Sequence, residues 1–574
     1  MPVHNSEIAA IFNEFADLLE IEEANPFRVR AYREAAVTIA NSPNSMAAMI
    51  EADQDLSLLP TIGKDLAAKI AEIVTTGHLT LLDELEKSVP GDVVKIAAIP
   101  GLGPKRIKVL HEQANVKDLE TLRNAAQAGK VRKLPGFGIK MEKLILRELD
   151  RLEATVRRWT ILEAEEFARP LTNYLKGQAG IEDVVIAGSY RRRRDTVGDL
   201  DILVTCPPDK AGTIVDRFTV YDEVDTIVSK GTTRSTVVLR CGLQVDLRVV
   251  PKESFGAALH YFTGSKAHNI AIRKMGVERG LKVNEYGVFH GGERLAGRTE
   301  AEIYDLFGLN VVPPELRENR GELEAARSGT LPRLVTQSDI RGDLHMHTTA
   351  SDGKANIRAM AEAAKAMGYD YISISDHSQR ATIANGLSAD RLARQIDEID
   401  EINSQLKSIR ILKSCEIDIL DDGRLDLSDD ILKRLDLRLG AIHYNFNLPR
   451  HEQTERIIRA MDNPLFNIFA HPTGRLINRR RPYDVDMERI VDAAKDRGCF
   501  LEVNASPSRL DLNDIHCRLA KERGVMVAIS TDAHSKAQLK QIRFGIDQAR
   551  RGWLEKDDVL NTRTWAGLKK LMKR

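Results

Sequence analysis

Two aspartates separated by one residue, Asp199 and Asp201, stand at the start of an apolar run that predicts a β-strand. Alternation along a strand places residues i and i+2 on one face, so the two carboxylates project together with Cα atoms ~7 Å apart. One or two divalent cations that prefer oxygen ligands would relieve their repulsion most economically. Asp246, in another apolar run, supplies a third donor if its strand lies beside the first. Two such ions can activate an attacking hydroxyl and stabilise a leaving pyrophosphate.

A solvated acidic strand edge is the ordinary explanation of a lone Asp-x-Asp pair. Here the pair follows Gly188-Ser189 after a spacing of nine residues, and a later strand holds the third aspartate. This combination is far more specific than the pair alone, and it favours metal-dependent transfer chemistry.

A second set of possible ligands occupies the C-terminal part of the chain. The segment 343–347 (Asp-Leu-His-Met-His) puts two imidazoles on one strand face, and most other members of the set follow apolar runs. The strand ends of an α/β barrel converge on one mouth, so these donors would meet in one pocket. A single buried histidine is usually a core residue, whereas six at strand ends with three carboxylates indicate a metal centre for Zn²⁺, Mn²⁺ or Fe rather than Ca²⁺. The set is His345, His347, Asp352, His377, Glu416, His443, His471, Asp532 and His534.

Three short segments, 59–64, 99–105 and 134–140, repeat a proline and glycine pattern before a helical stretch. Such a turn exposes N–H groups at the start of the helix, where the helix dipole favours a phosphate, and a following lysine adds charge. A helix turn with a glycine cap explains any single copy. The recurrence favours binding of DNA backbone phosphates without base readout. The three segments resemble helix-hairpin-helix DNA-binding motifs. The expected DNA contacts are Gly63, Lys64, Gly101, Gly103, Lys105, Gly136, Gly138 and Lys140.

The pattern of apolar residues predicts the elements that position these groups. Residues 1–150 have helical periodicity in helix-turn-helix units, while short β-rich runs from Ile181 onward predict a small mixed sheet. A polar stretch with glycines and a proline, 315–333, indicates a linker. Beyond it apolar strands alternate with helices, and seven such strands indicate a parallel α/β barrel that is incomplete or distorted relative to eight.

Composition sets broad limits on the kind of protein. The 574 residues include 84 Lys and Arg against 84 Asp and Glu, so the formal net charge is zero and does not by itself indicate a polyanionic partner. DNA would have to be bound by local groups of basic residues. Length predicts roughly three to five domains, and 43% hydrophobic residues suffice for several packed cores. The five cysteines form no Cys-x-x-Cys pair, and neither a leader pattern nor a membrane span is visible. A protein of the reducing cytoplasm is expected.

The Gly-Ser and Asp-x-Asp segments resemble the palm of the nucleotidyltransferase superfamily. The segment 261–265 (Tyr-Phe-Thr-Gly-Ser) narrows the resemblance to the X-family DNA polymerases, over about residues 1–315. It implies that Asp199 and Asp201 hold both catalytic ions, Mg²⁺ or Mn²⁺. Asp246 would hold the catalytic one and help to deprotonate the primer 3′-hydroxyl.

The same resemblance implies a set of residues that bind the incoming dNTP. Tyr261 and Phe262 would line its sugar pocket, and Arg273 would reach toward the template strand. Arg193, Gln244 and Lys266 depart from the family pattern, which bears on nucleotide affinity rather than on the reaction class. The full set is Gly188, Ser189, Arg192, Gly198, Tyr261, Phe262, Gly264, Lys266, Asn269 and Arg273.

Two further segments resemble known domains. Residues 25–33 and the helix that carries Lys69 resemble the small lyase domain of the same polymerases, in which an amine attacks an abasic sugar aldehyde. A solvated helix lysine is an equally good explanation of Lys69. The C-terminal ligand set resembles the PHP (polymerase and histidinol phosphatase) domain, a distorted seven-stranded barrel. That resemblance implies a phosphoesterase with about three metal ions held by the nine side chains.

We therefore interpret the chain as a multidomain DNA repair enzyme that fills short gaps in base excision repair. Its PHP domain would act as a 3′-5′ exonuclease, with 3′-phosphatase and abasic-site endonuclease activities as further expectations. The expected partners are gapped or nicked double-stranded DNA and dNTPs, with no membrane, and the expected state is a monomer. The expected domains are 1–85 (helix-hairpin-helix, lyase-like), 86–150 (helix-hairpin-helix, DNA-binding), 151–255 (palm), 256–315 (thumb), 316–338 (linker) and 339–574 (PHP).

Two other functions stay open at this point. In one, the PHP domain is a small-molecule phosphatase and the N-terminal half is a DNA-binding part without catalysis. In the other, the protein is a DNA-binding repair scaffold.

Overall fold

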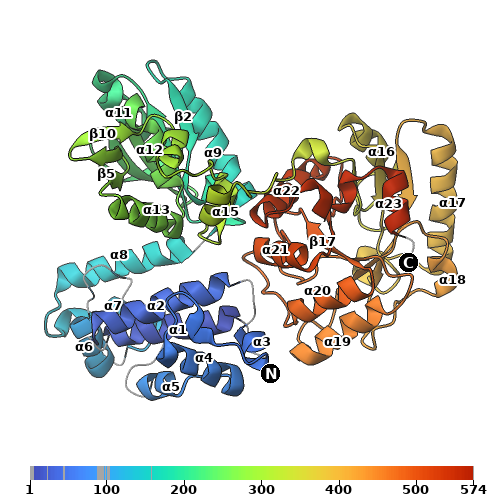
Figure 1. The fold of residues 1–574 in the computed structure, drawn as a ribbon, viewed down its shortest axis with the longest axis horizontal. Helices are drawn as coiled ribbons and strands as arrows, with labels where there is room; N and C mark the ends of the chain where they lie inside the picture. Colours follow the sequence, from blue (N-terminus) through green and yellow to red (C-terminus); the bar gives the residue numbers. More distant parts are fainter. Residues whose placement is uncertain are drawn as a thin grey trace. The chain divides into compact units, whose positions relative to one another are not determined.

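The computed structural model describes residues 5–21, 24–42, 46–86, 96, 99, 102, 104–114, 116–156 and 158–572. They belong to two compact units, Met1–Arg157 and Arg158–Arg574, each described here by itself. Figure 1 follows the chain from the helices of the first unit, in blue and cyan, to the barrel of the second, which ends in red. Within the described ranges, no helix combines the length and apolar character needed to span a bilayer.

The described part of the first unit is helical, as predicted. Helix α2 (Pro26–Asn41) begins where the side chain of Asn25 accepts a hydrogen bond from the N–H of Phe27. Helix α7 (Leu119–Gln127) begins with a capping box. One apolar cluster joins α1, α2 and α4, and a second joins α6, α7 and α8. The remaining helices are α1 (Asn5–Ile21), α3 (Met46–Glu51), α4 (Lys64–Thr76), α5 (Thr80–Glu86), α6 (Pro104–Ala114) and α8 (Ile139–Val156).

The second unit opens with the predicted mixed sheet, in the strand order β2-β4-β7-β6-β5. Strands β4 and β7 are parallel, and the other neighbours are antiparallel. Leu200, Ile202 and Val204 pack in one apolar cluster with helices α9 (Ile161–Lys176) and α11 (Ala211–Thr219). Alternation therefore turns Asp199 and Asp201 to the opposite face of the sheet. The strands are β2 (Asp183–Ile186), β4 (Asp199–Thr205), β5 (Val224–Lys230), β6 (Arg234–Leu239) and β7 (Gln244–Val250).

A helical layer and a small antiparallel sheet, β10-β9-β8, follow the mixed sheet. The stretch 316–338, expected as a linker, contains helix α15 (Glu322–Ser328), and its Leu323, Ala326 and Leu334 are buried in the apolar cluster of this region. The other elements are α12 (Phe255–Thr263), α13 (Lys266–Glu278), β8 (Lys282–Asn284), β9 (Gly287–His290), β10 (Glu293–Ala296) and α14 (Glu300–Leu306).

The C-terminal barrel consists of parallel strands in two ladders, β11-β12-β13 and β14-β15-β16-β17-β18. Strands β13 and β14 belong to one run interrupted at Ser414 and Cys415, so the barrel has the seven strand positions predicted. Single bridges, Met346 to Ala533 and His377 to Glu416, join the two ladders. The strands are β11 (Gly342–Asp343), β12 (Tyr371–Ile374), β13 (Arg410–Lys413), β14 (Glu416–Asp418), β15 (Leu439–Ala441), β16 (Ile468–Phe469), β17 (Phe500–Asn504) and β18 (Val527–Ser530).

Helices surround this barrel, and two apolar clusters hold it together. A large cluster joins the strands to the outer helices, and a smaller one fills the interior, where Leu344, Leu439 and Ile468 pack with Leu560 and Leu568 from the end of the chain. The helices are α16 (Ile357–Ala366), α17 (Ala389–Gln405), α18 (Asp429–Leu432), α19 (Arg450–Met461), α20 (Met487–Asp496), α21 (Asp514–Arg523), α22 (Ile542–Arg551) and α23 (Trp565–Leu571).

Candidate active sites

The three aspartates of the mixed sheet lie together. The parallel register of β4 and β7 sets Asp201 directly opposite Asp246, and Asp199 opposite Gln244. Asp246 accepts hydrogen bonds from Thr236 Oγ1 at 2.5 Å and from Gln244 Nε2 at 2.9 Å, which orient its carboxylate. The strand pairing that the sequence left conditional is thus present in the fold.

The environment of these carboxylates disfavours their charge. Burial, followed by the charges of Asp199 and Asp246, raises the pKa of Asp201 to about 7. Burial and then the charge of Asp246 raise the pKa of Asp199. Clustered carboxylates whose mutual repulsion is unrelieved are a donor set that fits divalent cations with oxygen ligands.

The glycine and serine upstream form a tight turn at this cluster. Gly188 has φ +60°, and a Cβ on it would stand 2.3 Å from Asp201 Oδ2, so the position requires glycine. Ser189 belongs to the same short helix, α10 (Gly188–Arg191). Gly198 directly precedes β4, and Arg192 follows α10. The Arg192 guanidinium donates to the carbonyl of Thr263 and to Glu318, the latter at 3.2 Å.

The sequence segment expected at the nucleotide sugar spans the end of α12. Tyr261 and Phe262 lie in the last turn of this helix, with their rings edge to face at 5.2 Å. The Arg248 guanidinium stands over the Phe262 ring at 4.3 Å. Gly264 ends the helix with φ +69°, and Asn269 Nδ2 donates to the Tyr261 carbonyl at 2.6 Å. Lys266 and Arg273 are exposed on α13.

The residues expected to contact DNA or an abasic site lie in the first unit. Gly63 is the N-cap of α4 and Lys64 its first residue, both exposed. Lys69 is 12% exposed and forms an ion pair with Asp65 one helical turn away. Gly136 (φ +78°) is exposed and Gly138 is half-buried before α8, which exposes Lys140 in its first turn. Gly101 and Gly103 lie outside the described residues, as does the side chain of Lys105.

The barrel brings all nine predicted ligands to one mouth. Glu416, 1% exposed, lies at the centre, with Nε2 of His471 at 2.7 Å, Nδ1 of His377 at 2.9 Å and Nε2 of His443 at 3.1 Å. Beside them, Asp532 Oδ1 lies 3.1 Å from Nε2 of His347 and 3.7 Å from Nε2 of His345.

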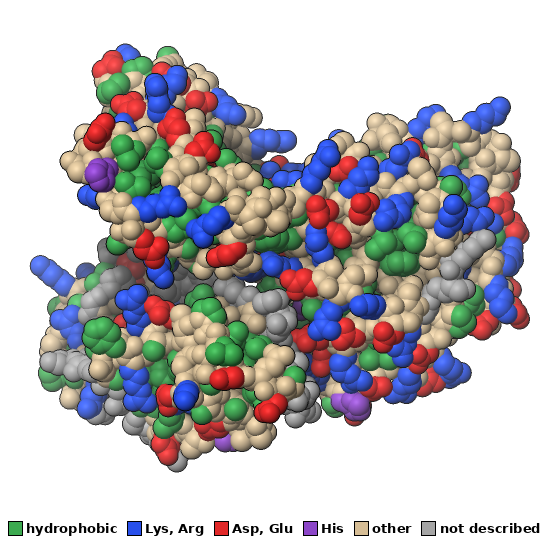
Figure 2. Space-filling model, viewed as in Figure 1, with side chains coloured by type: hydrophobic (Ala, Val, Ile, Leu, Met, Phe, Trp, Pro, Cys, Tyr) green, Lys and Arg blue, Asp and Glu red, His purple; other side chains and the backbone are tan. Residues whose placement is uncertain are grey.

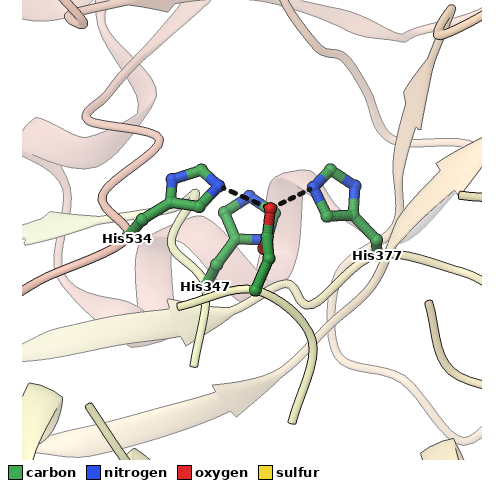
Figure 3. Close-up of side chains that lie close together, drawn as sticks. His347, His377 and His534 are labelled. Atoms are coloured by element: carbon green, nitrogen blue, oxygen red, sulfur yellow. Dashed lines mark ion pairs between the residues drawn. The ribbon is translucent and has the colours of Figure 1, made fainter. Parts of the chain in front are cut away.

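A third group completes the cluster. Figure 3 shows the rings of His347, His377 and His534 converging from different parts of the chain. Asp352 forms ion pairs with His377 and His534, at 3.7 and 3.3 Å. Within the described residues, three combinations of these side chains have donor atoms close enough to share an ion: His345, His347 and Asp532; His377, Glu416 and His443; and His347, Asp352, His377 and His534.

Burial and neighbouring charges shift the pKa values of these histidines in opposite directions. Burial, and then the charge of His377, lowers the pKa of His347 to about 4, and burial with Arg509 does the same for His471. Burial alone would raise the pKa of Glu416, but the surrounding histidines, His443 first, hold it well below its usual range. Among the residues that the structure describes, the buried Nδ1 atoms of His347 and His471 have no hydrogen-bond partner. Burial would also lower the pKa values of His443 and His534, but the charge of Glu416 raises that of His443 to about 10, and a hydrogen bond to Asp352 raises that of His534 to about 9. These two imidazoles must give up a proton to bind a metal, whereas neutral imidazoles beside an ionised carboxylate are already in the form that binds.

Two carboxylates that the sequence analysis missed support these ligands from behind. Glu502, fully buried in β17, accepts from Nδ1 of His345 and from the backbone N–H of His471, both at 2.7 Å. Asp418 lies 2.9 Å from Nδ1 of His443. Such partners fix the tautomer and leave Nε2 for a metal. Their only sequence signal was an acidic residue within an otherwise apolar strand.

The mouth opens into a cavity of ≈ 910 Å³. Its wall includes Arg380, Arg509 and Tyr444 beside the cluster, and the exposed Ile383. The Arg380 guanidinium stacks on the Tyr444 ring at 3.8 Å. Two arginines beside a set of candidate metal ligands suit a phosphodiester or phosphomonoester substrate.

Comparison with known proteins agrees with this architecture. Family models match along the chain: a helix-hairpin-helix domain (3–79), a SAM-like helix-hairpin-helix tandem (94–151), the DNA polymerase beta palm (162–243), the DNA polymerase beta thumb (258–318) and the PHP domain (343–506).

Individual relatives fall into two kinds. The DNA polymerase/3′-5′ exonuclease PolX of Bacillus subtilis (strain 168) is 38% identical over 576 residues, which cover 100% of both chains. A probable phosphatase of Thermoanaerobacter sp. (strain X514) is 29% identical over 38% of this chain and 89% of its own, and one of Caldanaerobacter subterraneus is 33% identical over 33% and 75%. Because the similarity to the Bacillus protein runs from end to end, the chain belongs to the X-family DNA polymerases that carry a C-terminal PHP domain.

Proposed function

We propose that the chain fills short gaps in DNA by adding deoxynucleotides, and that Asp199, Asp201 and Asp246 form the catalytic centre. The observation that carries this proposal is the parallel pairing of β4 and β7, which sets Asp201 opposite Asp246. The match to the DNA polymerase beta palm supports it, as does the polymerase activity for which the Bacillus relative is named.

The chain's own residues would divide the work as follows. Asp199 and Asp201 would hold both ions and Asp246 one, while Gln244 and Thr236 keep Asp246 in place to accept the proton of the primer hydroxyl. Mg²⁺ or Mn²⁺, when bound, would neutralise the carboxylates and the charge that develops on the phosphates. Gly188, Ser189 and Arg192 would bind the triphosphate, with Gly198 beside them.

The far side of the nucleotide would meet the end of α12. Tyr261 and Phe262 would contact the sugar there, and their bulk would disfavour a 2′-hydroxyl. Gly264 and Asn269 would lie by the sugar and base. Lys266 and Arg273, exposed on α13, are free to reach phosphates and the template strand.

A gapped-primer extension assay tests this centre. Asp246→Asn is expected to lower extension about 100- to 1000-fold, whereas Asp209→Asn, an exposed residue of the same domain, should keep it. Equal extension by Asp246→Asn and Asp209→Asn would remove the aspartates from the mechanism.

We further propose that the PHP domain removes nucleotides from DNA 3′ ends and processes blocked ends, using about three Zn²⁺, Mn²⁺ or Fe ions. The convergence of the nine ligands at a cavity lined by Arg380 and Arg509 supports this. Digestion of a 3′-labelled strand should be lost in Glu416→Gln and kept in Asp246→Asn. Loss of digestion in both variants would contradict two separate centres.

The alternative of a small-molecule phosphatase is not favoured, because the relatives named probable phosphatases match only the C-terminal part of the chain, whereas the Bacillus polymerase and exonuclease matches all of it. It predicts hydrolysis of a small phosphomonoester well above the digestion of labelled DNA, and no dNTP incorporation by any variant. A steady-state comparison of the two substrates at the barrel decides between them.

The first unit would bind the DNA backbone. Figure 2 shows Lys and Arg interspersed with Asp and Glu over the visible face, so local contacts rather than a broad positive field must hold the backbone. The exposed Gly63, Lys64, Gly136 and Lys140 suit phosphates, and Lys69 would act on 5′-deoxyribose phosphate. The expected substrates are gapped or nicked DNA and dNTPs, and the expected state is a monomer in the cytoplasm.

A further inference from the structure

Helix α22 of the barrel domain lies beside α9, the helix that packs on the mixed sheet, and beside α15 (Figure 1). Arg543 forms a bidentate ion pair with Glu165 of α9, at 2.6 and 2.9 Å. Phe544 packs into the apolar cluster beneath the mixed sheet. On its other side α22 packs closely on the barrel, because a Cβ at Gly545 would stand 2.7 Å from Ile529 of β18. Helix α22 therefore contacts both the barrel and the domain of the mixed sheet.

The last residue of this helix, Arg551, reaches the proposed triphosphate site. Its side chain is 2% exposed. One nitrogen, Nη2, donates to Asp514 of α21 at 2.6 Å. The other, Nη1, donates to the backbone carbonyl of Arg192 at 2.8 Å and to Glu318 at 3.1 Å. Arg551 thus binds two groups at once: the backbone of Arg192, which is proposed to bind the triphosphate, and the carboxylate of Glu318.

Glu318 is shared between the two domains. Its Oε1 atom accepts from Nε of Arg192 at 3.2 Å and from Arg551, and it lies 3.7 Å from Nη1 of Arg194. Burial alone would raise the pKa of Glu318, but Arg551 and then Arg192 and Arg194 lower it. The carboxylate is therefore ionised at neutral pH, and its side chain is 12% exposed.

This arrangement creates a conflict that Arg551 resolves. A triphosphate that approaches Arg192 meets the negative charge of Glu318 on the same guanidinium. Two anions that compete for one cation in a poorly solvated place repel each other, because screening by water is weak there. The positive charge of Arg551, which Asp514 shares, adds to that of Arg194 in compensating Glu318 and leaves Arg192 available to bind the nucleotide.

We propose that Arg551 of the barrel domain is a positioning residue for dNTP binding, acting through Glu318 and the backbone of Arg192. The barrel domain is therefore part of the polymerase nucleotide site as well as a separate hydrolase. This inference rests on the proposed function, since it requires Arg192 to bind the triphosphate.

Steady-state gap filling by the full chain tests the inference. Arg551→Met should raise the KM for dNTP about tenfold while kcat changes less than about twofold. The reason is that the substitution weakens the contact between Arg192 and the bound dNTP, which is made before the chemical step. Arg543→Met removes an ion pair from the same helix without touching Arg192 or Glu318, and it should leave the KM within about twofold. A residue that merely docks the domains would give equal effects in the two variants, and that result overturns the proposal.

Removal of the competing anion supplies the second test. Arg551→Met combined with Glu318→Gln should bring the KM back to within about twofold of the parent, because the uncompensated charge is gone. Glu318→Gln alone should lower the KM for dNTP. This single variant tests the proposal even if Arg551→Met fails to fold. A KM that stays high in the double variant, or that does not fall in Glu318→Gln, overturns the proposal.

Arg192→Ala separates this inference from the function on which it rests. If Arg192→Ala leaves the KM for dNTP unchanged, the proposed nucleotide site itself is wrong. If Arg192→Ala raises the KM and Arg551→Met does not, only the role of Arg551 is wrong.

Discussion

Gly188 and Asp201 approach so closely that a Cβ on residue 188 would stand 2.3 Å from Oδ2 of the aspartate. The positive φ of Gly188, +60°, adds to the constraint, because side chains other than hydrogen are strained there. The turn that precedes β4 is thus fitted around a carboxylate proposed to hold metal ions.

Gly188→Ala should therefore lower primer extension at least about 100-fold, because either the turn or Asp201 must move. Digestion of 3′-labelled DNA by the barrel should not change. Gly212→Ala is the matched control: it lies in α11 of the same domain with open space around it, and alanine there should be neutral or stabilise by about 0.5–1 kcal/mol. Unchanged primer extension by Gly188→Ala would show that the close approach of Gly188 to Asp201 does not matter for catalysis.

Glu502→Gln should weaken metal binding at the barrel mouth about 10- to 100-fold, since Glu502 orients His345 and the backbone of His471. Metal content after dialysis against a graded series of chelator concentrations measures this, together with digestion of 3′-labelled DNA. Glu522→Gln, an exposed residue of α21, serves as the control. Equal metal content in the two variants would count against a supporting role for Glu502.

Glu300 should make stability depend on pH in the acid range. Burial would raise the pKa of Glu300, but hydrogen bonds and charges from Arg191 and Arg317 outweigh it and lower the pKa to about 2. The unfolded chain, with an ordinary pKa near 4.5, takes up the proton first as pH falls. The contribution, on the order of 3 kcal/mol, is therefore full above pH ~4.5 and is lost as pH falls toward 2.

Urea unfolding of the parent and of Glu300→Gln at several pH values measures this contribution. The free energy of unfolding should differ most at neutral pH and converge as the solution is acidified. Glu293→Gln, exposed on β10, should follow the parent throughout. A difference between Glu300→Gln and the parent that does not change with pH would assign the effect to packing instead.

Lys69→Ala should abolish the covalent adduct that borohydride traps between the protein and 5′-deoxyribose phosphate, because an amine is the proposed nucleophile. Gap filling should continue, as the variant lies outside the mixed sheet. Lys130→Ala, an exposed residue of the same unit, should keep the adduct. An undiminished adduct in Lys69→Ala would show that another amine reacts.

Much of this protein could be predicted from local patterns. Strand alternation sufficed to predict that Asp199 and Asp201 lie on one face of a strand. The recurrence of histidines and carboxylates after apolar runs sufficed to predict that the barrel ligands meet at one mouth. Both predictions depend on short-range periodicity. The seven strand positions of the barrel followed from the same alternation of strands and helices.

Tertiary structure decided whatever depends on contacts between distant segments. The sequence left open whether the strand of Asp246 pairs with that of Asp201, and it concealed Glu502 and Asp418, whose roles arise only when strands bring them behind the histidines. Arg551 and Glu318 are 233 residues apart and belong to no motif. Their contact exists because packing of α22 buries both charges in one place, and burial makes such a pair matter.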